Sequence, residues 1–322
     1  MNKPKAVVLD GYTLNSTHDL SWEPLESICD ISIYEKTLPH ETVSRCKGCS
    51  IVFTNKVLIT SEVIDSLPEL KYVGVIATGY NVVDIEYAKK KGIVVTNVPS
   101  YGSESVAQLA FSFILEFCFH VGAHSEEVHQ GKWSQCEHFC YRSFPLYEIH
   151  GKTLGIFGMG NIGRALMRMA YGFGMKVLFT NRSQKTIPEF PEAKQVDFET
   201  LVSQSDFISL NAPLTEETRE LVNEKTLRLF KKGSYIINTA RGALINEQAV
   251  AEALKAGTLA GYATDVLSAE PPAPNNPLFG LENCLITPHM AWQTFEARSR
   301  LLSILADNAK AFIEGRVQNR VN

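Results

Sequence analysis

The sequence predicts an α/β protein built from two doubly wound, parallel-sheet domains of the Rossmann-like type. Short apolar runs rich in β-branched residues alternate with helix-like segments along the chain. These runs are apolar on both faces, which is typical of strands in a parallel sheet covered by helices on either side. With 322 residues, the chain exceeds what one hydrophobic core fills efficiently, so we expect two domains.

The first third of the chain carries the first of two α/β series. Its predicted strands lie at residues 6–9, 31–34, 51–54, 72–77 and 93–96, and its predicted helices lie at 63–67 and 84–91. A long apolar segment follows at 106–121, and Ser103 is a suitable N-cap for it. We expect this segment to form one buried helix that connects the two domains.

The second α/β series starts at Thr153. Its six predicted strands lie at residues 153–157, 176–180, 206–210, 234–238, 261–264 and 284–287. Helices separate these strands, and the helix at 247–256 has Asn246 as its N-cap and Gly257 as its C-terminal stop. The last helix, at 294–314, carries a stripe of apolar residues, and we expect it to return and pack on the first domain.

Composition excludes several classes of protein. The 31 basic and 35 acidic residues give a net charge of −4, so no cationic surface is available for a nucleic acid. No stretch approaches the roughly 20 apolar residues of a membrane span, and we expect a cytoplasmic protein without membrane partners. Seven scattered cysteines indicate free thiols. The segment Cys46-Lys47-Gly48-Cys49 has no second cysteine pair to complete a zinc site, so we expect no metal.

A glycine-rich motif opens the second series. Gly158-Met159-Gly160-Asn161-Ile162-Gly163 follows an apolar strand and precedes a segment whose apolar residues repeat at helical spacing. In this context the three glycines permit a tight turn, a close approach of a pyrophosphate to backbone N–H groups, and close packing of helix on sheet. The motif predicts a dinucleotide site at Gly158, Gly160, Asn161, Ile162 and Gly163. The alternative is an ordinary strand–turn–helix with incidental glycines.

Residues that follow the strands of the second series are further candidates, because ligands bind beyond the carboxyl ends of strands in an open parallel sheet. They are Asn181-Arg182-Ser183, Ala212-Pro213, Ala240-Arg241-Gly242, Asp265 and Pro288-His289. Each has a structural alternative: Arg241 as a helix-cap partner, Asp265 as a turn residue, and His289 as a loop histidine with satisfied hydrogen bonds. Together at one edge beside a nucleotide, they predict an active site.

Hydride transfer to a 2-keto acid explains this set of side chains. Arg241 is suited to hold the substrate carboxylate and polarise the carbonyl, because its planar guanidinium stays charged. His289 is the natural proton donor for the developing alkoxide. A carboxylate beside the imidazole fixes its tautomer and stabilises its protonated form, and Glu270 is the candidate. We therefore predict Arg241, Glu270 and His289 as catalytic residues.

Three ordered segments downstream of the glycine motif make a resemblance specific. They are Asn238-Thr239-Ala240-Arg241-Gly242, Asp265-Val266 with Glu270-Pro271, and Thr287-Pro288-His289. With Ala77-Thr78-Gly79-Tyr80-Asn81 and Asn97-Val98-Pro99 in the first third, the chain resembles the D-isomer-specific 2-hydroxyacid dehydrogenase family over nearly its whole length. Within that family, Leu9-Asp10-Gly11-Tyr12 and His289-Met290-Ala291-Trp292 are most similar to glycerate dehydrogenases, also called hydroxypyruvate reductases.

The resemblance implies an organisation and a set of roles. Residues 1–100 with 291–322 would form a discontinuous substrate-binding domain, 101–290 an inserted dinucleotide-binding domain, and the active site would occupy the cleft between them. Backbone N–H groups of Thr78 and Gly79 would bind the substrate carboxylate. Asp265 would hold the nicotinamide carboxamide, and the other predicted dinucleotide contacts are Ala212, Pro213, Thr239 and Ala240. A homodimer is also implied, and the aromatic-rich loop at 131–145 is a candidate subunit contact.

The expected cofactor follows from residues 181–183, and the expected substrate follows from Trp292. Asn181 stands where NAD-using members carry an Asp, and Arg182 and Ser183 follow it, so we expect NADP(H) to be favoured with NAD(H) possible; the alternative is a polar turn with Arg182 in solvent. Trp292 suggests a pocket for hydroxypyruvate or glyoxylate, unless it packs in the domain interface. Alternative functions are a dehydrogenase of D-lactate, phosphoglycerate, formate or phosphite, and a dinucleotide-sensing corepressor.

Overall fold

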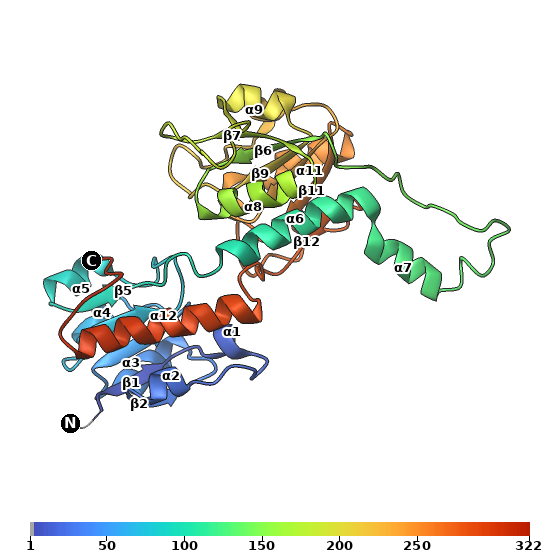
Figure 1. Cartoon of the computed structure of the whole chain (residues 1–322). Coiled ribbons are helices and arrows are strands. Elements are labelled where there is room, and N and C mark those ends of the chain that lie inside the picture. Colours follow the sequence, from blue (N-terminus) through green and yellow to red (C-terminus); the bar gives the residue numbers. More distant parts are fainter. Residues whose placement is uncertain (1–2) are drawn as a thin grey trace. The chain divides into compact units, whose positions relative to one another are not determined.

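The computed structural model describes residues 3–322. They divide into two compact units, each built around its own parallel sheet (Figure 1). Unit 1 comprises the chain up to Gly102 together with Gln293–Asn322, and unit 2 comprises Ser103–Trp292. Two sheets, each made of parallel strands, are the fold class that the sequence predicts.

Unit 1 contains a five-stranded sheet in the order β2-β1-β3-β4-β5. The strands are β1 (Lys5–Val8), β2 (Asp30–Ile33), β3 (Ile51–Thr54), β4 (Tyr72–Val75) and β5 (Val94–Thr96). Its helices are α1 (Tyr12–Asn15), α2 (Glu23–Glu26), η1 (Pro39–Glu41), α3 (Thr42–Cys46), α4 (Ser61–Asp65), α5 (Ile85–Lys90) and α12 (Phe295–Ile313). The central strands β3 and β4 are buried over their whole length, as expected for a sheet covered on both faces.

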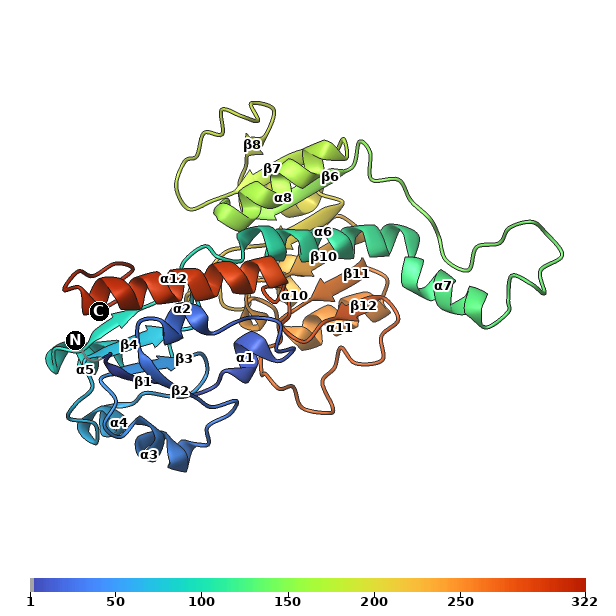
Figure 2. The ribbon, with the colours of Figure 1, turned by 60° about the horizontal axis from the view of Figure 1, so that its bottom comes forward.

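The last helix, α12, packs on unit 1, as the sequence predicts. It begins after Thr294, whose side chain accepts a hydrogen bond from the backbone N–H of Ala297, and runs beside β4 and α2 (Figures 1 and 2). Phe312 contacts the ring of the buried Tyr72, with 4.8 Å between ring centroids. The chain terminus beyond α12 then returns to the outer strand β5, where the backbone N–H of Val321 donates to the carbonyl of Val95.

Unit 2 contains a seven-stranded sheet in the order β12-β11-β10-β9-β6-β7-β8. The strands are β6 (Thr153–Phe157), β7 (Lys176–Thr180), β8 (Lys194–Gln195), β9 (Phe207–Leu210), β10 (Ser234–Asn238), β11 (Leu259–Thr264) and β12 (Cys284–Ile286). Its helices are α6 (Ser103–Phe119), α7 (Val121–His129), α8 (Asn161–Gly172), α9 (Phe198–Gln204), α10 (Glu224–Leu227), η2 (Gly242–Leu244) and α11 (Glu247–Lys255). The first strand of the unit, β6, lies between β7 and β9, which creates the switch in strand order where ligands bind in such sheets.

Two hydrophobic cores cover the two faces of this sheet. One core joins α6 and α8 to inward-facing residues such as Ile156 and Ile237, and Figure 2 shows the two helices side by side. The other joins α11 and the segment after β9 to Ile208 and Ile236. Asn246 caps α11 by accepting from the N–H of Ala249, as predicted. Helices on both faces make unit 2 a doubly wound domain.

The predicted single helix at 106–121 is wrong, because the segment forms two helices. Ser103 is already the first residue of α6 and not the residue before it, and α6 ends at Phe119. His120 adopts a left-handed backbone with a φ of 47°, which ends the helical hydrogen-bond series before α7 begins. The His124 Nδ1 atom lies 3.1 Å from the carbonyl oxygen of Phe119 and 3.0 Å from that of His120, so it satisfies the end of α6.

Two further features of unit 2 depart from the sequence prediction. The sequence predicted six of the seven strands of this sheet, and β8 was missed because it consists of two polar residues that pair with Leu178 and Phe179 of β7.

Helix α7 and residues 130–148, which we call the arm, extend away from the sheet of unit 2 (Figures 1 and 2). Within residues 3–322, no single helix is long and apolar enough to cross a membrane, and α6 and α7 pass that test only as a pair bent by 56°.

Candidate active site

The glycine motif forms the turn between β6 and α8. Gly158 has a φ of +100°, and a Cβ there would lie 2.8 Å from the backbone nitrogen of Ala212, so only glycine fits. At Gly163, a Cβ would lie 2.5 Å from the carbonyl oxygen of Gly158, so this glycine allows α8 to approach the turn. At Gly160 a Cβ would meet nothing within 4 Å, so the start of α8 faces open space.

These residues fit a dinucleotide. The twelve-residue helix α8 presents its first N–H groups at the open side of the turn, where a pyrophosphate is stabilised by the helix dipole. Ala212 adjoins Gly158. It follows β9, which lies on the other side of β6 from β7. Two buried polar atoms at neighbouring strand ends, Asn211 Oδ1 and Thr239 Oγ1, find no hydrogen-bond partner within residues 3–322. Buried polar groups normally have partners, so these two atoms suit a polar ligand.

The segment Asn181-Arg182-Ser183 follows β7 and is tied to the glycine turn. The Asn181 Oδ1 atom accepts a hydrogen bond of 3.3 Å from the backbone N–H of Met159, and its Nδ2 donates to the carbonyl of Ser183 at 3.0 Å. Gln195 of β8 donates to the backbone carbonyls of Asn181 and Ser183. The turn is thus fixed by its neighbours, while the exposed side chain of Arg182 makes no ion pair with any residue between 3 and 322.

His289 and Glu270 form a hydrogen-bonded pair beyond the ends of β12 and β11. The His289 Nδ1 atom lies 2.7 Å from Glu270 Oε2, and each side chain is about one-third exposed. The other carboxylate oxygen, Glu270 Oε1, accepts the backbone N–H of Leu267 at 3.0 Å. The carboxylate therefore accepts a hydrogen bond from Nδ1–H, which leaves Nε2 as the nitrogen available for proton transfer. His289 also has a φ of 53°, a left-handed conformation that is uncommon outside glycine and is often found at functional sites.

Asp265 organises the loop that carries His289. Its side chain is buried, and its oxygens accept hydrogen bonds from the hydroxyl of Thr287 and the backbone N–H groups of Met290 and Ala291. Burial raises the pKa of Asp265 above its ordinary value, and the three donors only partly offset this effect. All three donors come from the segment on either side of His289, so Asp265 fixes the position of the histidine.

Arg241 follows β10 on the same edge of the sheet. Asn238, the last residue of β10, accepts from the N–H of Ala240 and donates to the carbonyl of Arg241, so its amide holds the turn. The next residue, Gly242, packs against the loop that leads to Glu270: a Cβ on Gly242 would lie 1.9 Å from the carbonyl carbon of Leu267. The Arg241 side chain is exposed and donates to the carbonyl of Ala240. Sequence reasoning quoted Asn238 only as part of a motif and missed its role in the turn.

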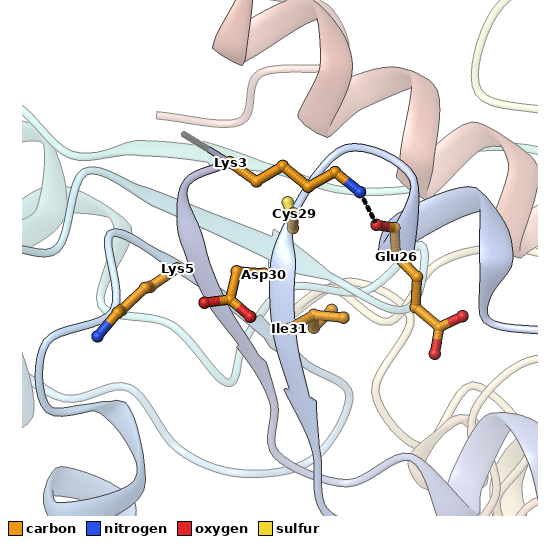
Figure 3. A pocket seen from close by; sticks show the side chains of 6 residues that line it. All are labelled: Lys3, Lys5, Glu26, Cys29, Asp30 and Ile31. Carbon is orange, nitrogen blue, oxygen red and sulfur yellow. Dashed lines mark hydrogen bonds between the residues drawn. The ribbon is translucent and has the colours of Figure 1, made fainter. Parts of the chain in front are cut away.

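Pro213 follows Ala212 in unit 2 and is exposed, and the remaining predicted residues lie in unit 1 or at its boundary. Thr78 and Gly79 follow β4, and the Thr78 hydroxyl donates to the carbonyl of Val98 at 2.8 Å. Trp292 is the last residue of unit 2 and is partly buried. Figure 3 shows a separate hollow in unit 1, lined by Lys3, Lys5, Glu26, Cys29, Asp30 and Ile31. It contains none of the predicted site residues.

The chain is similar to known proteins over its whole length. Residues 111–291 match the family model described as D-isomer specific 2-hydroxyacid dehydrogenase, NAD binding domain. A hydroxypyruvate reductase from Blautia hydrogenotrophica is 43% identical over 321 residues, which cover 99% of each chain. A glycerate dehydrogenase from Methylorubrum extorquens is 38% identical over 89% of this chain and 90% of its own. The solved structure of an acyclic imino acid reductase in complex with NADPH and D-Arg superposes with a TM-score of 0.85 at 30% identity, covering 99% of this chain and 100% of its own.

Proposed function

Because the chain belongs to the D-isomer-specific 2-hydroxyacid dehydrogenase family, we propose that it reduces hydroxypyruvate, and also glyoxylate, to the corresponding 2-hydroxy acid. The single observation that supports this activity best is the 2.7 Å contact between His289 Nδ1 and Glu270 Oε2, at the edge of the sheet that carries the glycine turn. It pairs a proton donor with the carboxylate that orients it, beside a site that fits a dinucleotide.

In this mechanism each side chain has one task. Arg241 binds the substrate carboxylate and polarises the keto oxygen. A reduced nicotinamide, when bound at the glycine turn, would supply the hydride for the keto carbon. His289 donates its Nε2 proton to the oxygen as negative charge develops there, and Glu270 stabilises the imidazolium before the proton leaves. Backbone N–H groups of Thr78 and Gly79 are assigned to the substrate carboxylate as well, and we assign the substrate-binding role to unit 1 and the dinucleotide-binding role to unit 2.

The glycine turn would hold the pyrophosphate, with contacts from Ala212, Pro213, Thr239 and Ala240. Asp265 acts chiefly through the loop of His289, because its carboxylate is buried and already accepts three hydrogen bonds. Its additional contact with the nicotinamide carboxamide would use the remaining acceptor capacity of the same oxygens.

The proposed cofactor preference is NADP(H) over NAD(H). The Asn181 amide is engaged by Met159 and Ser183 and carries no charge that would repel a 2′-phosphate, while the guanidinium of Arg182 is exposed next to it. The solved structure of the similar imino acid reductase in complex with NADPH supports this proposal. We expect kcat/KM to favour NADPH, and Arg182→Ala to lower kcat/KM for NADPH by about tenfold or more while leaving NADH nearly unchanged. Arg219→Ala, at another exposed arginine of unit 2, is the matched control. Equal losses with both cofactors would show that Arg182 does not bind the phosphate.

A panel of 2-keto acids, assayed with NADPH and NADH, tests the proposed activity. Hydroxypyruvate and glyoxylate should give a higher kcat/KM than phenylpyruvate or branched 2-keto acids, because the indole of Trp292 narrows the pocket. Dinucleotide binding with negligible turnover on every acid would refute the enzyme and favour a sensing function. A preference for phenylpyruvate would refute the small pocket.

The assembly belongs to the same proposal. Trp133 and Phe139 of the arm are exposed, Phe139 by 89%, and such apolar surface favours burial against a second copy of the chain. We propose a cytoplasmic homodimer in which residues 131–145 of the arm form a subunit contact. Sedimentation of the wild type and of a Phe139→Ser variant distinguishes this dimer from a monomer.

A further inference from the structure

Three asparagines of unit 1 form a closed ring of hydrogen bonds. The Asn308 Nδ2 atom donates to the carbonyl of Asn97 at 2.9 Å, and the Asn319 Nδ2 atom donates to Asn308 Oδ1 at 2.8 Å. The backbone N–H of Asn97 donates to the carbonyl of Asn319 at 3.1 Å and closes the ring. Asn97 follows β5, Asn308 lies in α12, and Asn319 belongs to the terminal segment. The ring therefore joins three parts of unit 1 that are distant in sequence.

The ring is connected to the segment after β4. The side chain of Asn97 is not used within the ring, and its Nδ2 donates to the carbonyl of Thr78 at 2.7 Å. Two further hydrogen bonds join the segments that follow β4 and β5. The Thr78 hydroxyl donates to the carbonyl of Val98 at 2.8 Å, and the N–H of Val98 donates to the carbonyl of Ala77 at 3.0 Å. The side chain of Asn97 thus holds the carbonyl of the peptide that links Thr78 to Gly79. The ring in turn holds the backbone of Asn97.

Burial indicates that the ring has a specific role. Asn308 is 1% exposed on a helix whose other buried residues are mostly apolar, and both of its amide hydrogen-bonding groups are directed to the ring. A buried amide costs free energy that apolar packing would avoid, so its position indicates a demand for orientation as well as stability. We propose that Asn308, acting through Asn97, is a positioning residue that sets the direction of the Thr78 and Gly79 N–H groups toward the substrate carboxylate.

This inference rests on the proposed function, because Thr78 and Gly79 bind the carboxylate only in that mechanism. The test uses Asn308→Ala, with Asn15→Ala as the matched control. Asn15 is also a buried asparagine of unit 1, at 5% exposed, but both of its hydrogen bonds go to the backbone of Leu20. Both variants remove a buried amide, and only Asn308→Ala opens the ring by removing the donor to the Asn97 carbonyl.

We expect Asn308→Ala to raise KM for hydroxypyruvate by about five- to tenfold, with kcat and dinucleotide Kd within about twofold of wild type. Asn15→Ala should lower the unfolding temperature comparably and leave KM unchanged. Asn319→Gly is a milder variant: Asn319 is exposed with a φ of 52°, which glycine adopts freely, so only the donor to Asn308 is lost. It should raise KM by about two- to threefold. Equal KM in wild type and Asn308→Ala would overturn the proposal.

Amide hydrogen exchange separates this proposal from the activity itself. If the wild type reduces no 2-keto acid, the proposed function fails, but the ring still predicts faster exchange in peptides covering residues 77–98 of Asn308→Ala than in Asn15→Ala. Unchanged exchange in that segment would show that Asn308 does not position the loop after β4, whatever the enzyme reduces.

Discussion

The carboxyl ends of the strands differ between the two units in the groups that they present. In unit 2 the strand ends carry ionisable side chains, with His289 and Glu270 in contact and Asp265 buried beneath their loop. Asp10 is the one buried carboxylate among the residues of unit 1 that the structure describes; it accepts hydrogen bonds from the backbone of Asn55 and Lys56, and burial raises its pKa. The loop after β4 is held by amides.

This difference matches two tasks of the proposed reaction, proton transfer and recognition of the substrate carboxylate. Proton transfer needs a side chain that can change its charge and a neighbour that controls it, and we assign this task to unit 2. Recognition of a fixed carboxylate needs only N–H groups held in one direction, and we assign this task to the segment of unit 1 that the amides hold. Under this proposal, changes in unit 2 should alter the chemical step, and changes in unit 1 should alter substrate affinity or stability.

Among the tests at Gly242, Glu270 and Asp19, the largest effect is expected at Gly242. An added Cβ would lie 1.9 Å from the carbonyl carbon of Leu267 and 2.3 Å from the nitrogen of Ser268, so the loop leading to Glu270 must move away from Arg241. Gly242→Ala should lower kcat/KM for hydroxypyruvate by about a hundredfold and reduce the unfolding temperature. Gly172→Ala is the control, because a Cβ there meets nothing within 4 Å. Similar activity in both variants would show that this close approach is not needed.

An intermediate effect is expected at Glu270. Glu270→Gln keeps an oxygen for the N–H of Leu267 but removes the negative charge beside His289. The imidazole then loses the carboxylate that orients it and stabilises its positive charge, so kcat for hydroxypyruvate should fall by about tenfold. The measurement is kcat and the dinucleotide Kd for both proteins at one pH. Equal kcat in the two proteins would leave Glu270 a structural residue.

The smallest effect concerns stability in unit 1. Arg298 makes two contacts of 2.7 Å with the carboxylate of Asp19, and these hydrogen bonds lower the pKa of Asp19. A lowered pKa in the folded state gives stability that is present above the ordinary aspartate pKa of about 3.9 and is lost as pH falls below it. Asp19→Asn should therefore lower the unfolding temperature slightly at pH 7, and the difference should shrink below about pH 4. A constant difference across this range would exclude the ion pair as its cause.

Much of the fold could be predicted from the sequence because apolar strands and capped helices have local signals. The Asn246 cap and the start of α12 after Thr294 are examples. The break at His120 could not be predicted, since apolar residues continue on both sides of it and only the backbone shows the left-handed turn. β8 was missed because two polar residues have no periodicity, and its pairing with β7 is a tertiary effect.

The candidate site shows the same division. Motif order brought attention to Arg241, Glu270 and His289, and the structure places Glu270 against His289. The burial of Asp265 under the histidine loop was not foreseen, because an aspartate after a strand has the same sequence signal whether it faces a ligand or the protein. The ring of Asn97, Asn308 and Asn319 has no sequence signal, since its members are separated by 211 positions between Asn97 and Asn308.

The central claim is that the edge of unit 2 performs the proton transfer, and His289→Ala tests it most directly. The turnover of hydroxypyruvate and the Kd of the dinucleotide should be measured on the same preparation, with circular dichroism as a check on folding. We expect kcat to fall by about a hundredfold or more while the dinucleotide Kd stays within about twofold of wild type. Wild-type turnover by His289→Ala would contradict the account.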